Sequence, residues 1–184
     1  NTLFNPKSLY GVSKLAAHYL IKNYREMYGL YACSGIMFNH ESPRRSNKFV
    51  TQKIIKGLKS GKCFSIGNLE SRRDWGHAKD FVEAMWVALQ QDKADDYVIS
   101  TGTSYSVRDF IEIAVKIMGK EIMWSGEKEN EIGMIDGEIV IKVSKEFYRP
   151  YTTGLLMGDP STIASLGWKR KFDLHVLIDD MIKG

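Results

Sequence analysis

Hydrophobic residues recur at helical spacing over the first long segment of the chain. Between residues 10 and 28 they stand three or four positions apart, as Val12, Leu15, Ala16, Tyr19, Leu20 and Tyr24. Pro6 and Ser8 stand where a helix can begin, and Gly29 stands where one can end. The pattern therefore predicts a long helix over 10–28.

Apolar runs and helical periods alternate after this helix. The run 31–38 is apolar enough for a strand covered on both faces, and it leads into a polar loop at 39–45. The pattern then predicts a helix at 49–58, a strand at 63–67, a helix at 79–91, a strand at 96–101 and a helix over 106–119. Ser106 and Asp109 have the spacing of a capping box at the start of the last helix. This alternation favours an α/β layer with parallel strands.

The last third of the chain has a different pattern. The segments 121–124 and 138–143 predict a small strand pair, and 159–183 predicts a helix in two pieces. A doubly wound nucleotide-binding fold carries a G-x-G-x-x-G turn after its first strand, and this sequence contains none. Either the fold is a different one, or its opening strands lie before residue 1.

Composition is typical of a soluble globular protein. The 184 residues are 43% hydrophobic and 26% charged, which is enough for one ordinary core. No apolar run approaches the roughly 18 to 20 residues that cross a bilayer, and the start does not resemble a signal peptide. We expect a cytoplasmic protein without a membrane segment. Cys33 and Cys63 lie in apolar runs, so we expect both to be reduced, buried thiols.

The net charge of +4 comes from basic residues spread along the chain. A nucleic-acid-binding tract is denser than this, so we expect no nucleic-acid partner, while small anionic ligands remain open.

Tyr10 and Lys14 are the first candidate catalytic pair. Residues four apart share one face of a helix, so a phenol and an ammonium can reach the same point. A cation near a phenol stabilises the phenolate, which can then take a proton from a hydroxyl undergoing oxidation. Taken alone this spacing is common, and an exposed amphipathic helix start would also explain it.

The context of this pair resembles a known family. The extended short-chain dehydrogenase/reductase family has a catalytic helix similar to NPKSLYGVSKLAAHYLIKNYREMYG. Within it, the GDP-mannose 4,6-dehydratases are similar in FNHESPRR, GNLESRRDWGHAKDFVEAMW, STGTSYSVRDFIEIA and FYRPYTTGLLMGDPSTIASLGWKRKFDL. The resemblance covers nearly the whole chain. It implies the C-terminal part of a Rossmann-like doubly wound parallel sheet plus a smaller α+β substrate-binding region.

The resemblance also implies an activity. GDP-mannose would be converted to GDP-4-keto-6-deoxymannose, a precursor of GDP-fucose, with transient hydride transfer through bound NADP. Tyr10 would act as the base, and Lys14 would assist it and bind the cofactor. The family's elimination step needs a Glu and a Thr that precede the tyrosine helix, so we expect the isolated chain to be inactive. Family members form homodimers or homotetramers, and we expect the same here.

Further site residues are implied by position. For the cofactor these are Tyr10, Lys14, His40 and Arg45. For the GDP-sugar they are Asn39, Lys53, Asn68, Leu69, Arg73, Arg149 and Thr152. Alternatively, His40 is a loop histidine held by the backbone, and Arg44 with Arg45 is a solvated pair, a site for an extra phosphate or a subunit contact.

The segment 74–77 and the position of Thr152 carry separate expectations. Asp74, Trp75 and His77 are expected to lock a loop in place as scaffold. The family usually has a glutamate where this chain has Thr152, so a charge-assisted bond to a ribose is lost, a difference of about 1 to 2 kcal/mol.

The resemblance implies a division of the chain. Residues 1–48 and 79–102 would belong to the NADP-binding domain, and 49–78 and 103–184 would bind the nucleotide sugar. Two other functions remain open: another nucleotide-sugar epimerase or dehydratase of the same superfamily, and a non-catalytic nucleotide-sugar binding module.

Overall fold

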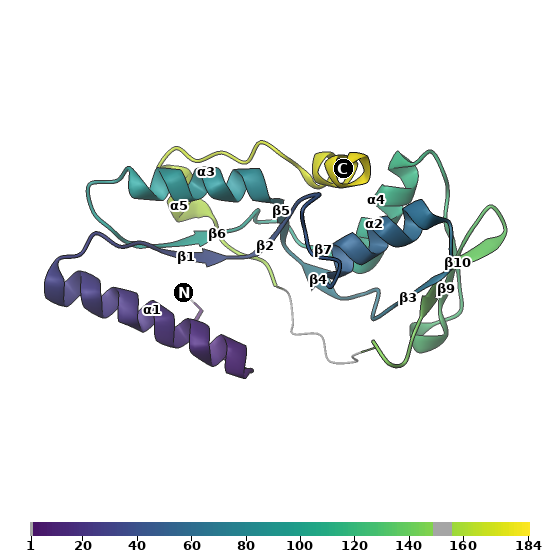
Figure 1. Ribbon diagram of the computed structural model, residues 1–184, viewed down its shortest axis with the longest axis horizontal. Coiled ribbons are helices and arrows are strands. Elements are labelled where there is room, and N and C mark those ends of the chain that lie inside the picture. Colours follow the sequence, from purple (N-terminus) through teal and green to yellow (C-terminus); the bar gives the residue numbers. More distant parts are fainter. Residues whose placement is uncertain (1, 149–155) are drawn as a thin grey trace.

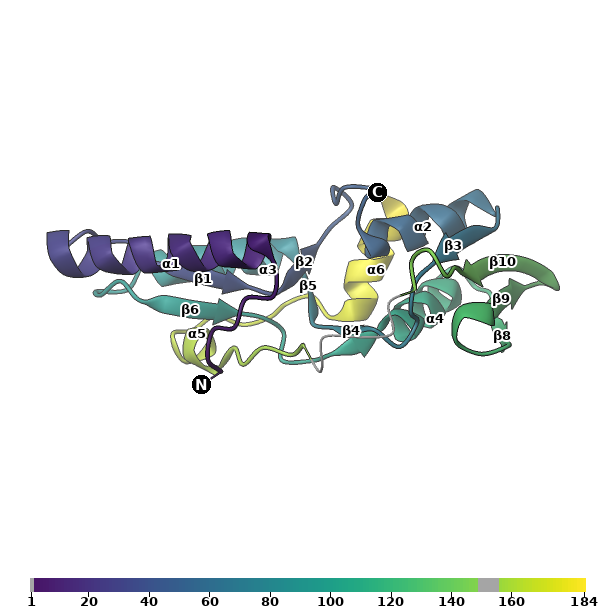
Figure 2. The same cartoon turned by 90° about the horizontal axis from the view of Figure 1, so that it is seen from below.

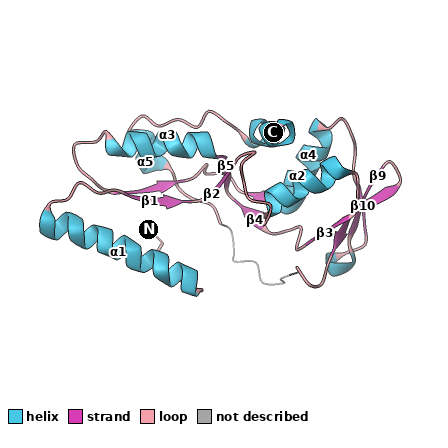
Figure 3. Cartoon of the chain, viewed as in Figure 1, coloured by secondary structure: helices cyan, strands magenta, loops and turns pink. Residues whose placement is uncertain are grey.

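The computed structural model describes residues 2–148 and 156–184 (Figures 1 and 3). Its helices are α1 (Leu9–Tyr28), α2 (Val50–Ser60), α3 (Ala78–Leu89), α4 (Val107–Ile117), α5 (Ser161–Ser165) and α6 (Leu174–Lys183). Its strands are β1 (Ser34–Met37), β2 (Asn39–Glu41), β3 (Phe64–Ile66), β4 (Arg72–Arg73), β5 (Trp75–His77), β6 (Asp96–Ile99), β7 (Tyr105–Ser106), β8 (Met123–Ser125), β9 (Ile132–Ile135) and β10 (Glu138–Val143). Arg149 and Thr152, two predicted substrate residues, lie outside the described residues.

The predicted helices are confirmed, with boundaries set by their caps. Ser8 accepts a hydrogen bond from the Gly11 amide at the start of α1, and Gly29 ends that helix at φ 62°. At the start of α4 the Ser106 and Asp109 side chains each bond the other's backbone amide, which completes the capping box. The tail forms two helical pieces, α5 and α6, as the sequence predicts.

The strands form four small sheets. The parallel pairs are β1 with β6, β2 with β5, and β3 with β10. The antiparallel pairs are β4 with β7, β8 with β9, and β10 with β9. The predicted parallel α/β organisation is confirmed for the first part of the chain.

Several local predictions were wrong. The predicted loop 39–45 begins as strand β2, and β5 occupies most of the predicted turn at 74–77. The predicted partner of β10 was β8, but β9 lies between the two strands. Only Ser34 of β1 is buried, so the strand is not covered on both faces; among the described strands, β6 is its only partner.

The core residues fall into two groups. We call the part built on β1, β6, α1, α3 and α5 the β1–β6 lobe, and Figure 1 shows α1 and α3 on opposite sides of its strand pair. Its buried residues come mainly from α3 and β6 and include Phe81, Tyr97 and Ile99. Ile163 and Trp168, from the segment that the sequence division assigns to the sugar-binding region, pack into this same cluster.

The second part, built on β3, β8, β9, β10, α2, α4 and α6, is the β3–β10 lobe. Its buried residues come from all three helices and from the sheet, with Phe110, Ile111, Ile141 and Leu177 each fully buried. Figure 2 shows α6 at the boundary between the lobes, where it contacts β5, α4 and α2.

The cysteine prediction was wrong for one residue. Cys33 is half-buried, and its thiol lies 3.6 Å from the Ala88 carbonyl. Cys63 is exposed because it precedes β3, an edge strand of its sheet. Both thiols are free, as expected.

Candidate functional site

Tyr10 and Lys14 lie on one face of α1. The Lys14 Nζ atom is 5.5 Å from the centre of the Tyr10 ring, in the range of a cation–π contact. The Tyr10 side chain is 71% exposed, and α1 has no buried residue. Figure 1 shows the first turns of α1, in the darkest purple, on the side of the molecule where β2 lies. The pair is therefore open to a ligand from that side.

Polar contacts fix α1 to the rest of the β1–β6 lobe. Arg25 donates to the Ala32 carbonyl at 3.0 Å and to the Asp96 carboxylate at 2.5 Å. The hydrogen bond to Asp96 raises the pKa of Arg25 above its usual value. Burial alone would raise the pKa of Asp96, but the hydrogen bond from Arg25 and the charge of its guanidinium bring the pKa below the usual value. These contacts set the position of the helix that carries Tyr10.

Asn39 and His40 lie in β2, next to the end of β1. In the register of β2 with β5, Asn39 is opposite Trp75 and His40 is opposite Gly76. The His40 Nδ1 atom is 2.9 Å from the Phe38 carbonyl, and since a carbonyl only accepts, Nδ1 carries the proton. His40 is therefore held by the backbone, as the alternative in the sequence analysis states. This hydrogen bond orients the ring and does not exclude a ligand from Nε2.

Arg45 is held by a carboxylate that the sequence analysis did not single out. Its Nε atom is 3.1 Å from Glu41 Oε2, and its guanidinium lies 3.4 Å from the centre of the Phe49 ring. Glu41 is 1% exposed and accepts a hydrogen bond of 2.8 Å from the Thr51 hydroxyl. Burial raises the pKa of Glu41. No sequence signal marks Glu41, because its burial follows from the tertiary contacts of β2 and α2.

Lys53 lies against the segment that follows β10. Its Nζ atom lies 4.1 Å from the centre of the Phe147 ring. Gly67 packs against the same residue so closely that a Cβ atom there would come 2.6 Å from the Phe147 carbonyl oxygen. Lys53 and Gly67 thus both lie against Phe147. In the sequence, Phe147 stands two residues before the predicted anchor Arg149.

Asn68 and Leu69 follow directly and differ in exposure. The Asn68 side chain is half-buried and accepts a hydrogen bond of 2.9 Å from the Glu70 amide. Leu69 is 2% exposed and belongs to the hydrophobic core, so the structure leaves no surface of its side chain for a ligand.

Arg73 is a half-buried cation on β4. Burial lowers the pKa of its guanidinium, and among the described residues none forms a salt bridge with it. Its neighbour Arg72 differs, because its guanidinium lies 3.7 Å from the Asp109 carboxylate. A cation that is partly removed from water without an acidic partner is suited to bind an anion.

The expected scaffold role of residues 74–77 is confirmed. The Asp74 carboxylate accepts hydrogen bonds from the Thr101 and Gly102 amides, and Trp75 is 2% exposed. His77 caps α3 through its Nδ1 atom, which accepts from the Lys79 amide, and its Nε2 atom lies 3.0 Å from Asp180.

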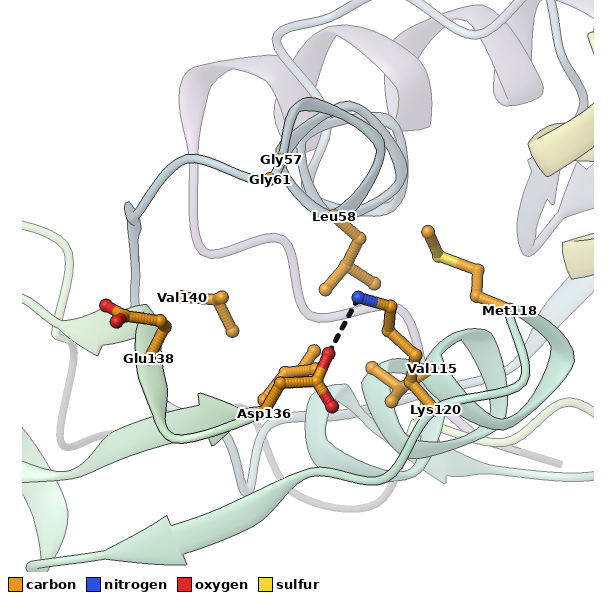
Figure 4. A pocket seen from close by; sticks show the side chains of 10 residues that line it. Gly57, Leu58, Gly61, Val115, Met118, Lys120, Asp136, Glu138 and Val140 are labelled. Atoms are coloured by element: carbon orange, nitrogen blue, oxygen red, sulfur yellow. Dashed lines mark hydrogen bonds and ion pairs between the residues drawn. The ribbon is translucent and has the colours of Figure 1, made fainter.

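One pocket of the β3–β10 lobe lies apart from these residues (Figure 4). It encloses about 220 Å³ between the ends of α2 and α4 and the β9–β10 hairpin, and no predicted site residue lines it. The exposed pair Lys120 and Asp136, 2.9 Å apart, stands at this pocket. Within the described ranges, no cluster of three or more His, Cys, Asp or Glu could hold a metal ion.

Solved structures define the class of fold. RMD from Pseudomonas aeruginosa, complexed with NADPH, has a TM-score of 0.78 and 21% identity, and the match covers 97% of this chain and 56% of that one. UDP-glucuronic acid 4-epimerase from Bacillus cereus, in complex with UDP-glucuronic acid and NAD, has a TM-score of 0.77 and 20% identity, covering 97% and 52%. The protein therefore has the Rossmann-type fold of these nucleotide-cofactor enzymes, in part.

Sequence relatives define the family. The family profile of GDP-mannose 4,6 dehydratase matches residues 1–181. The GDP-mannose 4,6 dehydratase of Cricetulus griseus is 46% identical over 99% of this chain, and that of Homo sapiens is 45% identical over 98%. The chain belongs to the GDP-mannose 4,6-dehydratase family.

The chain spans about half the length of the curated relatives it matches: 51% of the Cricetulus griseus protein and 54% of the Vibrio cholerae protein. Of the helices in the described part of the chain, none combines the length and the apolar character that crossing a membrane demands.

Proposed function

We propose that this chain is part of an NADP-dependent GDP-mannose 4,6-dehydratase that forms GDP-4-keto-6-deoxymannose in deoxysugar synthesis. The observation that carries the proposal is the Tyr10–Lys14 pair on one helix face, in a chain that the family profile matches over residues 1–181. This activity combines an internal oxidation, an elimination of water and a reduction, so the chain must hold one sugar nucleotide through all three.

Tyr10 is the proposed base. The Lys14 ammonium would stabilise its phenolate form, which takes the proton of the sugar C4 hydroxyl while that carbon is oxidised and so becomes the neutral phenol. The exposure of Tyr10 supports this role, because a base must reach its substrate.

Arg73 and Lys53 are the proposed anchors of the diphosphate. Each comes from a different element, β4 and α2, so that two cations can approach one diphosphate from two directions. Asn39, at the start of β2, would orient the sugar between these anchors and Tyr10. Asn68 would line the same site, and Arg149 and Thr152 complete the proposed set.

His40, Arg45, Tyr10 and Lys14 are the proposed contacts of this chain with NADP, which when bound would accept and return the hydride. The fit rests on the residues themselves. The Nδ1 proton of His40 is donated to the Phe38 carbonyl, which leaves Nε2 for a ligand, and the Arg45 guanidinium is held in place by Phe49 and Glu41. RMD is complexed with NADPH and the Bacillus cereus epimerase with NAD, which supports a nicotinamide cofactor, while the choice of NADP rests on the family resemblance.

A chimera tests the proposed reaction. The N-terminal half of the Cricetulus griseus relative is joined to this chain, and the product from GDP-mannose is identified by mass spectrometry and NMR. We expect a GDP-sugar that has lost one water. An epimer of unchanged mass would instead establish the alternative of a nucleotide-sugar epimerase.

The second candidate is a non-catalytic nucleotide-sugar binding module. It rests on one observation: the proposed diphosphate anchors Lys53 and Arg73 both belong to elements of this chain, α2 and β4. GDP binding and chimera turnover together support the dehydratase, whereas GDP binding with a chimera that never turns over supports the module. For the isolated 184 residues we expect no turnover.

We further propose a cytoplasmic homodimer or homotetramer. The apolar surface of α1, which includes Leu20, Tyr24 and Met27, supports an assembly that covers this helix. Light scattering after gel filtration measures the assembly, and Leu20→Glu should shift it towards the monomer.

A further inference from the structure

Asp74 occupies the junction between β4 and β5. Its side chain is 0% exposed, and it stands between Arg73, the last residue of β4, and Trp75, the first of β5. A carboxylate buried to this extent is costly unless its oxygen atoms are hydrogen-bonded.

Four donors from two other segments satisfy this carboxylate. Oδ1 accepts from the Thr101 amide at 2.9 Å and from the Thr101 hydroxyl at 2.7 Å. Oδ2 accepts from the Gly102 amide at 3.0 Å and from the Gly158 amide at 3.3 Å. Asp74 thus joins the β4–β5 junction to the chain that leaves β6 and to the chain that precedes α5.

The two glycines are required by this arrangement. Gly158 packs so closely that a Cβ atom there would lie 2.4 Å from the Ser100 Oγ atom. Gly102 has a φ of +72°, which favours glycine. Both amides are therefore held at the carboxylate by backbone geometry that other residues would strain.

We propose that Asp74 is a positioning residue for Arg73 in the binding of the nucleoside diphosphate; this rests on the proposed function. Asp74 directly follows Arg73, so the carboxylate, held by its four donors, restrains the backbone from which the Arg73 guanidinium extends. The strand β4 has only two residues and pairs with a β7 of two residues. The ladder alone fixes Arg73 weakly, and the buried carboxylate supplies the remaining constraint.

The same carboxylate relates the anchor to the sugar end of the site. Trp75, the next residue, is opposite Asn39 in the register of β5 with β2. A shift at Asp74 therefore moves Arg73 relative to Asn39, so the diphosphate and the sugar can no longer meet both residues at once.

The test is a double-mutant cycle measured by calorimetric titration of the chain with GDP. Arg73→Ala should weaken GDP binding roughly 10- to 100-fold through loss of a charge-assisted bond. Asp74→Asn, which replaces one acceptor oxygen by an NH2 group, should weaken it about tenfold. In the Arg73→Ala background, Asp74→Asn should change the affinity less than about twofold, because Asp74 acts through Arg73.

A second variant keeps the test decisive if Asp74→Asn does not fold. Thr101→Val removes the hydroxyl that donates to Oδ1, and with it the 3.2 Å hydrogen bonds of that hydroxyl to the Thr103 backbone, but it leaves the Thr101 amide, so the same cycle can be run with Thr101→Val. Thr101→Ser retains the hydroxyl and is the matched control, with wild-type GDP affinity expected. Hydrogen exchange of the Gly102 and Gly158 amides should be faster in Asp74→Asn whether or not GDP is present.

The outcomes separate the two levels of the proposal. Equal losses on Asp74→Asn with and without Arg73 would overturn the positioning role alone, since the carboxylate would then act on the general stability of the fold. If the wild-type chain does not bind GDP, the proposed function fails and the inference falls with it. Non-additive losses, together with faster exchange of both glycine amides, support the inference.

Discussion

The β3–β10 lobe and the β1–β6 lobe bury hydrophobic residues to very different degrees. In the first, three helices and a four-stranded sheet surround a core in which Phe110, Ile111 and Leu177 are fully buried. In the second, α1 has no buried residue, and the outer face of α3 leaves Trp86 63% and Val82 61% exposed.

The difference shows what holds each lobe together. Burial of apolar surface stabilises the β3–β10 lobe without help from outside. In the β1–β6 lobe, α1 is attached through Arg25, Asp96 and the Tyr31 hydroxyl, which donates to the Gln91 carbonyl at 2.5 Å. We therefore expect mutations in the β3–β10 core to act through lost burial, and mutations that loosen α1 to act through polar contacts.

The largest expected effect is in the core of the β3–β10 lobe. Phe110→Ala leaves a cavity at a residue that is 0% exposed and should lower the free energy of unfolding by about 3 to 5 kcal/mol. The matched variant Val82→Ala, at a residue of α3 that is 61% exposed, should change it by less than about 0.5 kcal/mol. Urea unfolding measures both, and equal losses would break the comparison.

A smaller effect is expected at the attachment of α1. Arg25→Ala removes the donor to Asp96 and to the Ala32 carbonyl, which should cost about 1 to 3 kcal/mol. Hydrogen exchange should show faster exchange in α1 and no change in α4. The control Lys22→Ala removes only an exposed pair with Glu26, and protection of α1 should stay the same.

The stability of the α1 attachment should also depend on pH in the acid range. Because the pKa of Asp96 is lower in the folded chain, its contribution to stability is present above the unfolded pKa and is lost as pH falls through the folded one. Asp96→Asn should flatten the loss of α1 protection between about pH 5 and pH 1. The exposed Asp92→Asn is the control; an identical pH profile for wild type and Asp96→Asn would rule out this role.

The smallest effect is expected at the pocket of Figure 4. Lys120 and Asp136 form a pair whose side chains are 49% and 70% exposed, so solvent screens it. Lys120→Ala should change the free energy of unfolding by less than about 0.5 kcal/mol, measured by urea unfolding. A loss comparable to that of Arg25→Ala would mean that surface pairs matter in both lobes.

Most of the helices could be predicted from the sequence, because helices longer than two turns leave a periodic signal and their caps mark the ends. Ser8, Gly29 and Ser106 gave boundaries close to those observed. The strands β2, β4, β5 and β7 have two or three residues each, which is too short for an alternating pattern. Their existence depends on tertiary pairing that the local sequence does not encode.

The site shows the same limit. The common face of Tyr10 and Lys14 followed from helix geometry. The role of Glu41 as a buried hydrogen-bond acceptor did not, because a carboxylate in a polar loop looks the same whether it is exposed or buried. The burial of Leu69 was likewise hidden, since a single leucine after a strand carries no periodicity.

The rate of GDP-mannose turnover by the chimera with Tyr10→Phe tests the central claim most directly. Phenylalanine keeps the ring beside Lys14 and removes only the hydroxyl. The account predicts a rate lower by about 10²- to 10⁴-fold, with GDP affinity unchanged. Turnover at the wild-type rate would contradict it, because another group would then be the base.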